Sequence, residues 1–185
     1  YLLLLQCCAM NLFCRDSTVT PVAITASSAL KPTPNYTYEP HLISDGNPNT
    51  TWAEGVAGDG IGEFVLFTFQ NSARIQGVEI INGFPTMHPQ LGDLYYLNNR
   101  LQAARIEFED GTEEIRLRND VKTAQTIKFV RPHISKTAKL IITGAFPGTK
   151  WKDTCIAEIS FHGKSLDSDS IPHAVWIIQK SDCGL

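Results

Sequence analysis

Short apolar segments separated by polar turns recur along the middle of the chain. Residues 64–69 (FVLFTF) are almost continuously apolar, as in a strand covered on both faces. The other segments alternate apolar and polar residues or are rich in β-branched residues, and they cover residues 75–84, 104–109, 114–117, 126–130, 139–143 and 155–161. No ten-residue stretch between Trp52 and His162 has helical periodicity. The pattern predicts an all-β fold, an antiparallel β-sandwich.

One turn between two of these segments has a clear sequence signal. Asp110 and Gly111 form a dipeptide typical of tight β-hairpins. Alternation places the apolar residues before and after the turn on one face of the predicted hairpin. The residues expected to be buried there are Ile106, Phe108, Ile115 and Leu117.

The two ends of the chain differ from its middle, and three parts are predicted: residues 1–17, 18–163 and 164–185. Between residues 18 and 40, four prolines forbid long helices, so this stretch is expected to be extended and irregular. After residue 163 a polar connector leads to an apolar segment at 171–178. That C-terminal extension either docks on the sandwich or forms part of a partner interface.

Length and composition suit one domain with short additions. The 185 residues are 43% hydrophobic and 19% charged, which is ordinary for a globular protein that buries a core. Sixteen Lys plus Arg and nineteen Asp plus Glu give a net charge of −3, without any basic run. Nucleic acid is therefore an unsuitable partner, because its binding needs a clustered basic surface.

The first residues, YLLLLQCCAMNLFC, resemble the end of a signal peptide. This apolar run is shorter than the roughly 20 residues that span a bilayer. Leu4, Leu5, Gln6 and Cys7 resemble a loose bacterial lipobox, which implies lipidation of Cys7, with Cys8 or Cys14 as alternative acceptors. The other interpretation is a buried N-terminal strand or helix. Export predicts a bacterial surface or outer-membrane lipoprotein, or a secreted protein, with membrane contact only through a lipid anchor.

The remaining cysteines are Cys155 and Cys183. Neither belongs to a CxxC pair or to a Cys/His cluster with zinc spacing, so a transition-metal site is not expected. The two residues could form a disulfide between the last strand and the tail. The favoured alternative is that Cys155 is a free thiol in the core, where unpaired cysteines are often found.

The loop DGNPNTTWAEGVAGDGIGE, residues 45–63, is dense in oxygen donors and glycines. Closely spaced carboxylate, amide and hydroxyl oxygens suit a hard cation such as calcium. The spacing is not that of an EF-hand, because Thr50 and Val56 stand where the glycine and the bidentate Glu are required. The GxGxG run leads into a strand instead of a helix, which argues against a dinucleotide site. We expect a metal-stiffened loop beside a binding surface.

Several ordered motifs resemble those of a known family. ASSAL, DGNPNTTW and AEISF are similar to segments of discoidin domains, also called coagulation factor 5/8 type C domains. TTWAEGVAGDGIGEFVLFTF, IINGF, NNRLQ and DTCIAEISFHG resemble the discoidin-like module of streptococcal NAD glycohydrolase and of many bacterial surface proteins. The resemblance covers about residues 25–163. It implies a galactose-binding-like jelly roll, and it does not imply NAD cleavage, because the similar module is the non-catalytic translocation part.

The resemblance also implies a structural calcium ion between the early loop and the last strand, pinning the loop that carries Trp52 to the sheet. Asp45 and Glu158 would supply carboxylates, and Asn47 stands where many relatives have Asp. The alternative is a set of Asx turns, with Glu158 bonded to backbone amides. The implied metal-ligating residues are Leu42, Asp45, Asn47, Thr50, Ala157 and Glu158.

A second group of polar and aromatic residues has two interpretations. It either forms a pocket for a sugar or another small ligand, or it is an internal scaffold in which Arg100 hydrogen-bonds carboxylates and carbonyls; the scaffold is favoured for Arg100. The insertion 84–100 suits recognition through loops, although His88 in it is expected to be a solvated loop residue. The candidate ligand-binding residues are Trp52, Glu54, Asp59, Tyr95, Tyr96, Asn98, Asn99, Arg100, Trp151 and Asp153.

No hydrolase, metalloprotease or P-loop motif is present in the sequence. A glycosidase using two of Glu54, Asp59 and Glu63 is the least favoured interpretation. The sequence instead predicts a non-enzymatic surface module that binds a glycan or a host or matrix protein. The main alternative is an adapter lipoprotein that binds another envelope protein.

Overall fold

The computed structural model describes residues 17–166, and β-strands make up most of them. Two short helical segments, a 3-10 helix and one α-helical turn, lie outside the strands. The elements are β1 (Thr18–Val19), β2 (Pro21–Ala26), η1 (Pro40–Ser44), β3 (Trp52–Ala53), β4 (Phe64–Asn82), β5 (Met87–His88), β6 (Gly92–Asp93), α1 (Leu94–Leu97), β7 (Asn99–Phe108), β8 (Gly111–Arg116), β9 (Gln125–Phe146) and β10 (Thr154–Ser165).

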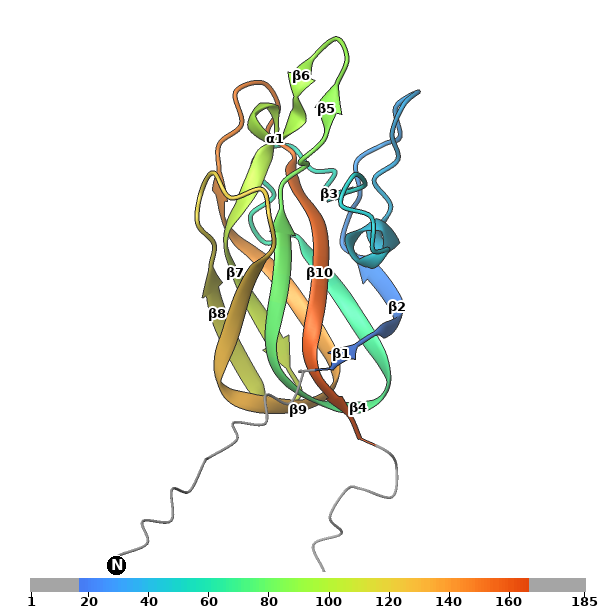
Figure 1. Cartoon of the computed structure of the whole chain (residues 1–185), viewed down its shortest axis with the longest axis vertical. Helices are drawn as coiled ribbons and strands as arrows, with labels where there is room; N and C mark the ends of the chain where they lie inside the picture. Colours follow the sequence, from blue (N-terminus) through green and yellow to red (C-terminus); the bar gives the residue numbers. More distant parts are fainter. Residues whose placement is uncertain (1–16, 167–185) are drawn as a thin grey trace, which may run out of the picture.

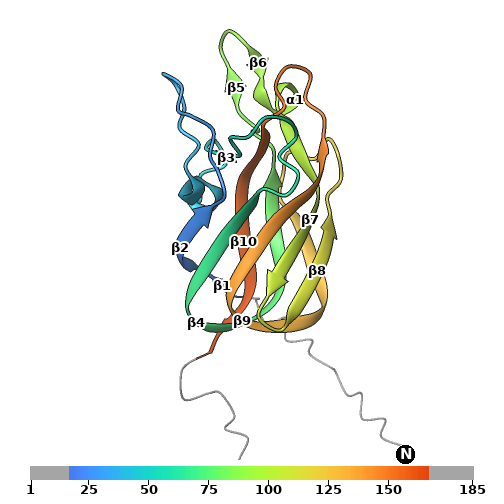
Figure 2. The ribbon, with the colours of Figure 1, turned by 180° about the vertical axis from the view of Figure 1, so that it is seen from behind.

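The main sheet curls around one core. Its strand order is β1-β10-β4-β9-β7-β8, with β2 added on β4 and β3 added on β10. All pairings are antiparallel except that of β10 with β7, which joins two strands distant along this order and helps to close the sheet. Figures 1 and 2 show the strands wrapped around a common interior. The predicted antiparallel β-sandwich is confirmed.

The sequence pattern divided β4 and β9 into separate strands, whereas each is one continuous element that folds over at the lower end of the molecule (Figure 1). The first leg of β4, residues 64–69, pairs with β2 through residues 65–69 and with residues 137–141 of β9 through residues 64–68. The second leg, residues 73–82, pairs with β10 and with residues 125–135 of β9. Register shifts between Thr68 and Ala73 and between Ile75 and Gly77 accompany the bend. Such irregularities let one strand serve both layers of a sandwich.

The predicted hairpin at Asp110 and Gly111 is confirmed, since β7 and β8 pair from Ala103 opposite Arg116 to Phe108 opposite Gly111. The apolar residues on its inner face are buried, as alternation required. The stretch 18–40, predicted to be extended and irregular, contains the extended strand β2, which pairs with β4. Pro21 is tolerated as the first residue of β2 because this strand lies at an edge of the sheet.

Two apolar clusters fill the interior. In the larger one, the ring of Phe161 packs edge-on against Phe67 and Phe69, with centroids 5.0 and 5.2 Å apart. A smaller cluster under the upper loops contains Phe84 and Cys155. Cys155 is a free, buried thiol whose pKa is raised by that burial. Within residues 17–166, no helix is long and apolar enough to cross a membrane. The predictions for Cys7, Cys183 and residues 171–178 lie outside the described residues.

Candidate functional site

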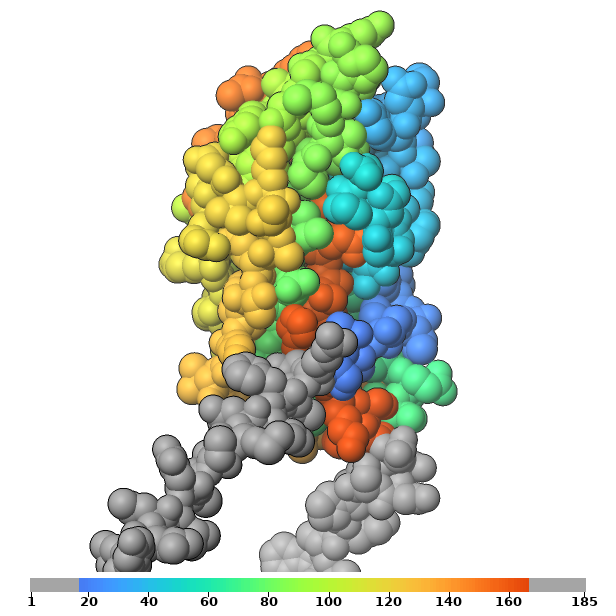
Figure 3. Space-filling model, viewed as in Figure 1, coloured from blue at the N-terminus to red at the C-terminus, as the bar shows by residue number. Residues whose placement is uncertain are grey.

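The loops that carry most of the predicted site residues gather at the upper end of the sandwich. Figure 3 shows the segment before η1, in blue, standing beside the projecting β5–β6 hairpin, in green. Residues 147–153, which lead into β10, reach the same end (Figure 1). The Thr149 and Lys150 amides donate to the Tyr96 and Leu97 carbonyls, which ties this last loop to α1.

The loop after η1 is held by a network centred on Asp45. Its Oδ1 atom accepts the Asn47 amide at 2.8 Å, and its two carboxylate oxygens lie 3.0 and 2.9 Å from the Thr50 hydroxyl. The Thr50 hydroxyl is also 2.7 Å from the Asn47 carbonyl. These contacts are Asx-turn contacts, so the turn alternative is present in the structure. They also bring oxygen atoms of Asp45, Asn47 and Thr50 together in one small volume.

Glu158 faces this loop from β10, at a register shift between Ile156 and Glu158. Burial is the largest influence on its carboxyl group, followed by the adjacent Asp45 carboxylate, and together they raise its pKa to about 7 from an ordinary 4.5. The Gly46 and Asn47 amides oppose that shift. Burial also acts on Asp45, but hydrogen bonds from Glu158 and from its own turn hold the pKa of Asp45 below its usual value. Glu158 therefore holds the proton that the pair shares.

In the described part of the chain, one oxygen of this pair has no hydrogen-bond partner. Glu158 Oε1 is buried without a hydrogen bond, and an unsatisfied buried acceptor costs about 1–3 kcal/mol. Two facing carboxylates, a hydroxyl and nearby backbone form an oxygen-only donor set, which suits calcium better than a transition metal. The other implied ligands, Leu42 in η1 and Ala157 in β10, belong to elements that pack together. The residues present fit the implied ion.

The Glu158 pKa predicts a pH dependence for the metal-free protein. Because the folded state binds this proton more tightly than the unfolded state, the stabilisation is complete below about pH 4.5 and is lost as pH rises through about 7. In the presence of a chelator, the melting temperature should fall over that interval. The Glu158→Gln variant, compared with the parent in the same buffers, should show a smaller fall; an identical pH profile would contradict this assignment.

Glu54 lies inside the protein and holds the backbone amides of two residues. It is completely buried, and its two carboxylate oxygens accept the Thr154 and Val56 amides, each at 2.9 Å. Burial nevertheless raises its pKa. Gly60 lies against it with a φ of +66°, and a β-carbon there would come within 2.5 Å of Glu54 Cγ. The glycine-rich loop therefore closes over a buried carboxylate.

This packing predicts that Gly60→Ala is more destabilising than Gly62→Ala. Both glycines have positive φ, +66° and +94°, but nothing lies within 4 Å of a β-carbon at Gly62. Both substitutions carry the backbone cost of about 1 kcal/mol or more, and only Gly60→Ala adds the clash with Glu54. Chemical denaturation should separate the two variants. Equal free energies of unfolding would show that the loop moves aside.

Arg100 is part of the scaffold, as favoured from the sequence. Its Nη1 atom donates to the Tyr95 and Asn98 carbonyls, both at 3.1 Å, and Nη2 donates to Asn119 Oδ1 at 3.2 Å and to the Pro147 carbonyl at 3.4 Å. Three of these partners are backbone carbonyls, as expected, and Asn119 supplies a side-chain amide oxygen; the carboxylates that were also expected are not among them. A planar fork of donors satisfies several loop carbonyls at once.

Asn99 and Asp59 join the glycine-rich loop to the loop before β10. Asn99 Nδ2 donates to Asp59 Oδ1 at 3.0 Å, and Asn99 Oδ1 accepts the Gly148 amide at 2.7 Å. The Thr154 hydroxyl donates to the Asp59 carbonyl at 2.8 Å. With these partners inside the protein, the two side chains fix the loops.

Two of the aromatic residues predicted to contact ligand are in the interior. The Trp52 and Tyr95 side chains are both completely buried. Trp52 Nε1 donates to the Ser28 carbonyl at 3.0 Å, and the Tyr95 hydroxyl donates to the Val121 carbonyl at 3.3 Å. A ring without exposed area cannot stack on a sugar, so their predicted role in direct contact is corrected to that of supports. Tyr96, in contrast, is 41% exposed on α1.

A pocket of about 260 Å³ opens between residues 30–38, the 84–98 insertion and the loop before β10. Three of the predicted ligand-binding residues line it: Asn98, Trp151 and Asp153. Its volume is slightly below the range of about 300–1,000 Å³ typical of sites for drug-sized ligands. The pocket therefore suits a single ring-sized group.

Aromatic residues that the sequence reasoning missed form much of the pocket wall. Tyr36 packs edge-on against Phe84 at 5.2 Å, and Tyr38 lines the same space. They belong to the proline-rich stretch before η1, where the only available signal was the Tyr-x-Tyr pair. Trp151 is half-buried, with the Lys150 ammonium 4.5 Å from its ring centroid.

The wall of this pocket includes the polar side chains of His88 and Asp153. His88, predicted to be a solvated loop residue, is half-exposed and lines the pocket. Its Nδ1 atom accepts the Gln90 and Leu91 amides at 3.1 and 3.2 Å, which leaves Nε2 as the N–H donor of the ring. Asp153 is half-buried, and that burial raises its pKa. Donors and acceptors thus accompany the aromatic walls.

The glycosidase interpretation finds no support in this geometry. Glu54 bonds backbone amides, and Glu63 Oε2 accepts the Ser27 and Ser28 hydroxyls at 2.6 and 2.5 Å. Neither of them, nor Asp59, lines the pocket at the loop end. Two carboxylates that face a common cleft, which glycoside hydrolysis requires, are not found among these three.

Solved structures with the same fold include several carbohydrate-binding modules. A pectin-binding module is 19% identical, with 78% of this chain and 91% of that chain covered and a TM-score of 0.55. A family 32 module from Clostridium perfringens in complex with galactose is 15% identical, with 78% and 97% covered and a TM-score of 0.52. An F5/8 type C domain from Bacteroides fragilis is 21% identical, with 81% and 97% covered and a TM-score of 0.55. At these identities the likeness shows the fold, which confirms the jelly roll, and not the ligand.

The comparison of sequences is more specific. The model of the NAD glycohydrolase translocation F5/8 type C domain matches residues 14–162. No protein of curated function matches the chain. The match spans nearly the whole described sandwich, including the Asp45 loop, the insertion and β10. The chain belongs to the family of NAD glycohydrolase translocation F5/8 type C domains.

Proposed function

We propose that this protein is a non-catalytic, surface-exposed module that binds a glycan in the pocket lined by Tyr36, Trp151 and Asp153. The observation that carries the proposal is an aromatic pocket at the loop end with amide, carboxyl and imidazole groups in its wall. Sugars have apolar faces that pack on aromatic rings and hydroxyls that need hydrogen-bond partners, and this pocket supplies both. Carbohydrate-binding modules with the same fold support it.

Trp151→Ala is expected to abolish glycan binding while leaving the fold intact. Its ring lies on the pocket wall, half-exposed, so truncation removes contact area from the ligand more than from the core. A glycan array should identify a ligand, and titration calorimetry should show a loss of affinity of about tenfold or more.

Tyr96→Ala is the matched control, since Tyr96 is an exposed aromatic residue that does not line the pocket. It should bind with nearly the parent affinity. Binding lost in Tyr96→Ala and retained in Trp151→Ala would place the site elsewhere and contradict the proposal.

We also propose that calcium stiffens the loop next to this end. Asp45 and Glu158 would hold it by their carboxylates, Thr50 by its hydroxyl, and Leu42, Asn47 and Ala157 by backbone oxygens. A bound divalent cation would neutralise the two facing carboxylates and give the unpartnered Glu158 oxygen a ligand. Its role is structural, because the loop leads directly to the buried Trp52.

A second candidate function is an adapter that binds a host, matrix or envelope protein. The β5–β6 hairpin exposes Met87 and Leu91, which are 71% and 41% accessible. Adaptable apolar side chains on a projecting hairpin are typical of protein contacts. Pull-down of an envelope partner that Met87→Asp abolishes, without any glycan signal, would favour this function. Either function fits export to the cell surface or secretion, and anchoring through Cys7 would give the only membrane contact.

A further inference from the structure

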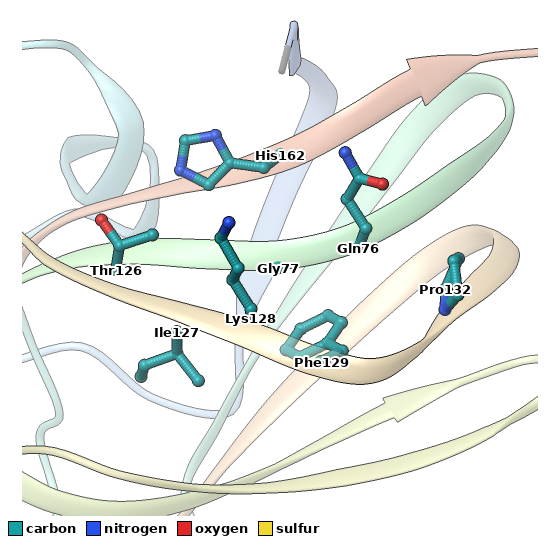
Figure 4. A pocket seen from close by; sticks show the side chains of 8 residues that line it. All are labelled: Gln76, Gly77, Thr126, Ile127, Lys128, Phe129, Pro132 and His162. Atoms are coloured by element: carbon teal, nitrogen blue, oxygen red, sulfur yellow. The ribbon is translucent and has the colours of Figure 1, made fainter. Parts of the chain in front are cut away.

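A second cavity lies on the flank of the sandwich, away from the loop end. It has a volume of about 610 Å³ and is lined by β4, β9 and β10. Figure 4 shows the side chains of His162, Lys128 and Gln76 around it. On β10, Ile159 and Phe161 point into the core, so alternation places His162 on the outer face of the sheet. This cavity shares no lining residue with the aromatic pocket.

A glycine creates the hollow. The strand register aligns His162 of β10, Gly77 of β4 and Lys128 of β9 in one row across the sheet. A β-carbon at Gly77 would lie 2.6 Å from the Ile127 carbonyl oxygen, so this position does not tolerate a side chain. Figure 4 shows Lys128 extending over Gly77 toward His162. The middle of the row is therefore open, with a basic residue on each side.

Within residues 17–166, the side-chain nitrogen atoms of these two basic residues have no hydrogen-bond or ion-pair partner. Both ring nitrogens of His162 are buried without a hydrogen bond. Among the described residues, Lys128 makes no ion pair. An acidic residue, Glu79, accepts a hydrogen bond at 3.1 Å from the hydroxyl of Thr126, which lines the cavity. Lys128 is exposed, whereas the His162 ring nitrogens are buried, and buried polar groups without partners are rare in folded proteins and often mark a missing ion or ligand.

We propose that this cavity is an oxyanion site, binding a phosphate, sulfate or carboxylate group of a small ligand between His162 and Lys128. An imidazole N–H and an ammonium group would give charge-assisted hydrogen bonds, which are about twice as strong as neutral ones. Phe129 and Pro132 provide an apolar side for the rest of the ligand. The site is independent of glycan binding at the loop end.

The test is an NMR titration of the full chain with inorganic phosphate, sulfate and acetate in turn, at constant pH and ionic strength. The His162 ring signals, assigned by their loss in His162→Gln, should shift in a saturable way with at least one of the three anions. The anion that binds most tightly identifies the group. Lys128→Gln should weaken that binding by about tenfold or more.

Lys136→Gln is the control, because Lys136 is exposed on the same strand, as Lys128 is, but does not line the cavity. It should change the affinity less than twofold, which is the order expected for a screened surface charge. The absence of a saturable shift with all three anions would overturn the proposal, as would equal weakening by both lysine variants. Lys128→Gln should leave glycan binding unchanged, so failure of one proposal is distinguishable from failure of the other.

Discussion

Saturating calcium is expected to raise the melting temperature of the full chain by about 5–10 °C, and either Asp45→Ala or Glu158→Ala should abolish that gain. A ligand ion whose free concentration is about one hundred times its Kd stabilises the folded state by about 2.7 kcal/mol. Each kcal/mol of added stability raises the melting temperature of a domain of this size by about 2–4 °C. The two carboxylates come from the loop after η1 and from β10, so the ion would link segments far apart in sequence.

The control for this experiment is Glu114→Ala. It removes the same charge from an exposed position on β8 and should retain the full calcium effect. Measurements with excess chelator give the metal-free reference. If the parent gains nothing from calcium, Asp45 and Glu158 act only through the hydrogen-bonded turn. A calcium effect that persists in both variants would place the ion elsewhere.

Trp52→Ala should cost about 3–5 kcal/mol of the free energy of unfolding, the largest stability loss expected from a single substitution here. The indole is completely buried in the main core, and its Nε1 atom donates to the Ser28 carbonyl at 3.0 Å. Truncation would leave both a cavity and an unpaired carbonyl. Denaturant unfolding monitored by circular dichroism measures the loss.

Trp151→Ala provides the comparison for Trp52→Ala. Trp151 is half-exposed on the pocket wall, so its truncation should cost less than about 1.5 kcal/mol. Glycan binding should respond in the opposite order: lost in Trp151→Ala and retained by the folded fraction of Trp52→Ala. A small stability loss for Trp52→Ala would contradict its role as a core residue and restore it as a ligand contact.

Most of the fold could be predicted from local pattern. Strand alternation at residues 104–117 and the Asp110–Gly111 turn specify which faces are buried, because a shift of one residue would expose the apolar side. The continuity of β4 and β9 could not be predicted in the same way. Their bends occur at register shifts that depend on which strands lie on either side. Hydrophobic periodicity indicates which residues of a strand are buried, but it does not indicate which strands pair with it.

The candidate site was predicted only in part, for a related reason. Asn98, Trp151 and Asp153, which were predicted to contact a ligand, line the pocket, whereas Trp52 and Tyr95 are inside the protein. An aromatic residue in a glycine-rich or polar loop has the same sequence signature whether its ring faces solvent or core. Tyr36 and Tyr38 also line the pocket, although nothing in the sequence of their proline-rich stretch predicted a binding role. The packing of that stretch beside the insertion brings them there.

The residue types thus established the β-sandwich and the chemistry available in the Asp45 loop, since alternation, turn dipeptides and oxygen-rich spacing are local properties of the chain. The family was indicated by the resemblance of longer ordered motifs. Distances between segments far apart in sequence are not local properties. The folded sheet brings Glu158 to Asp45, places Tyr36 against Phe84, and aligns His162 with Lys128 across Gly77. Burial and strand register arise only when these segments pack together. They determine which polar groups support the fold and which remain open to a ligand.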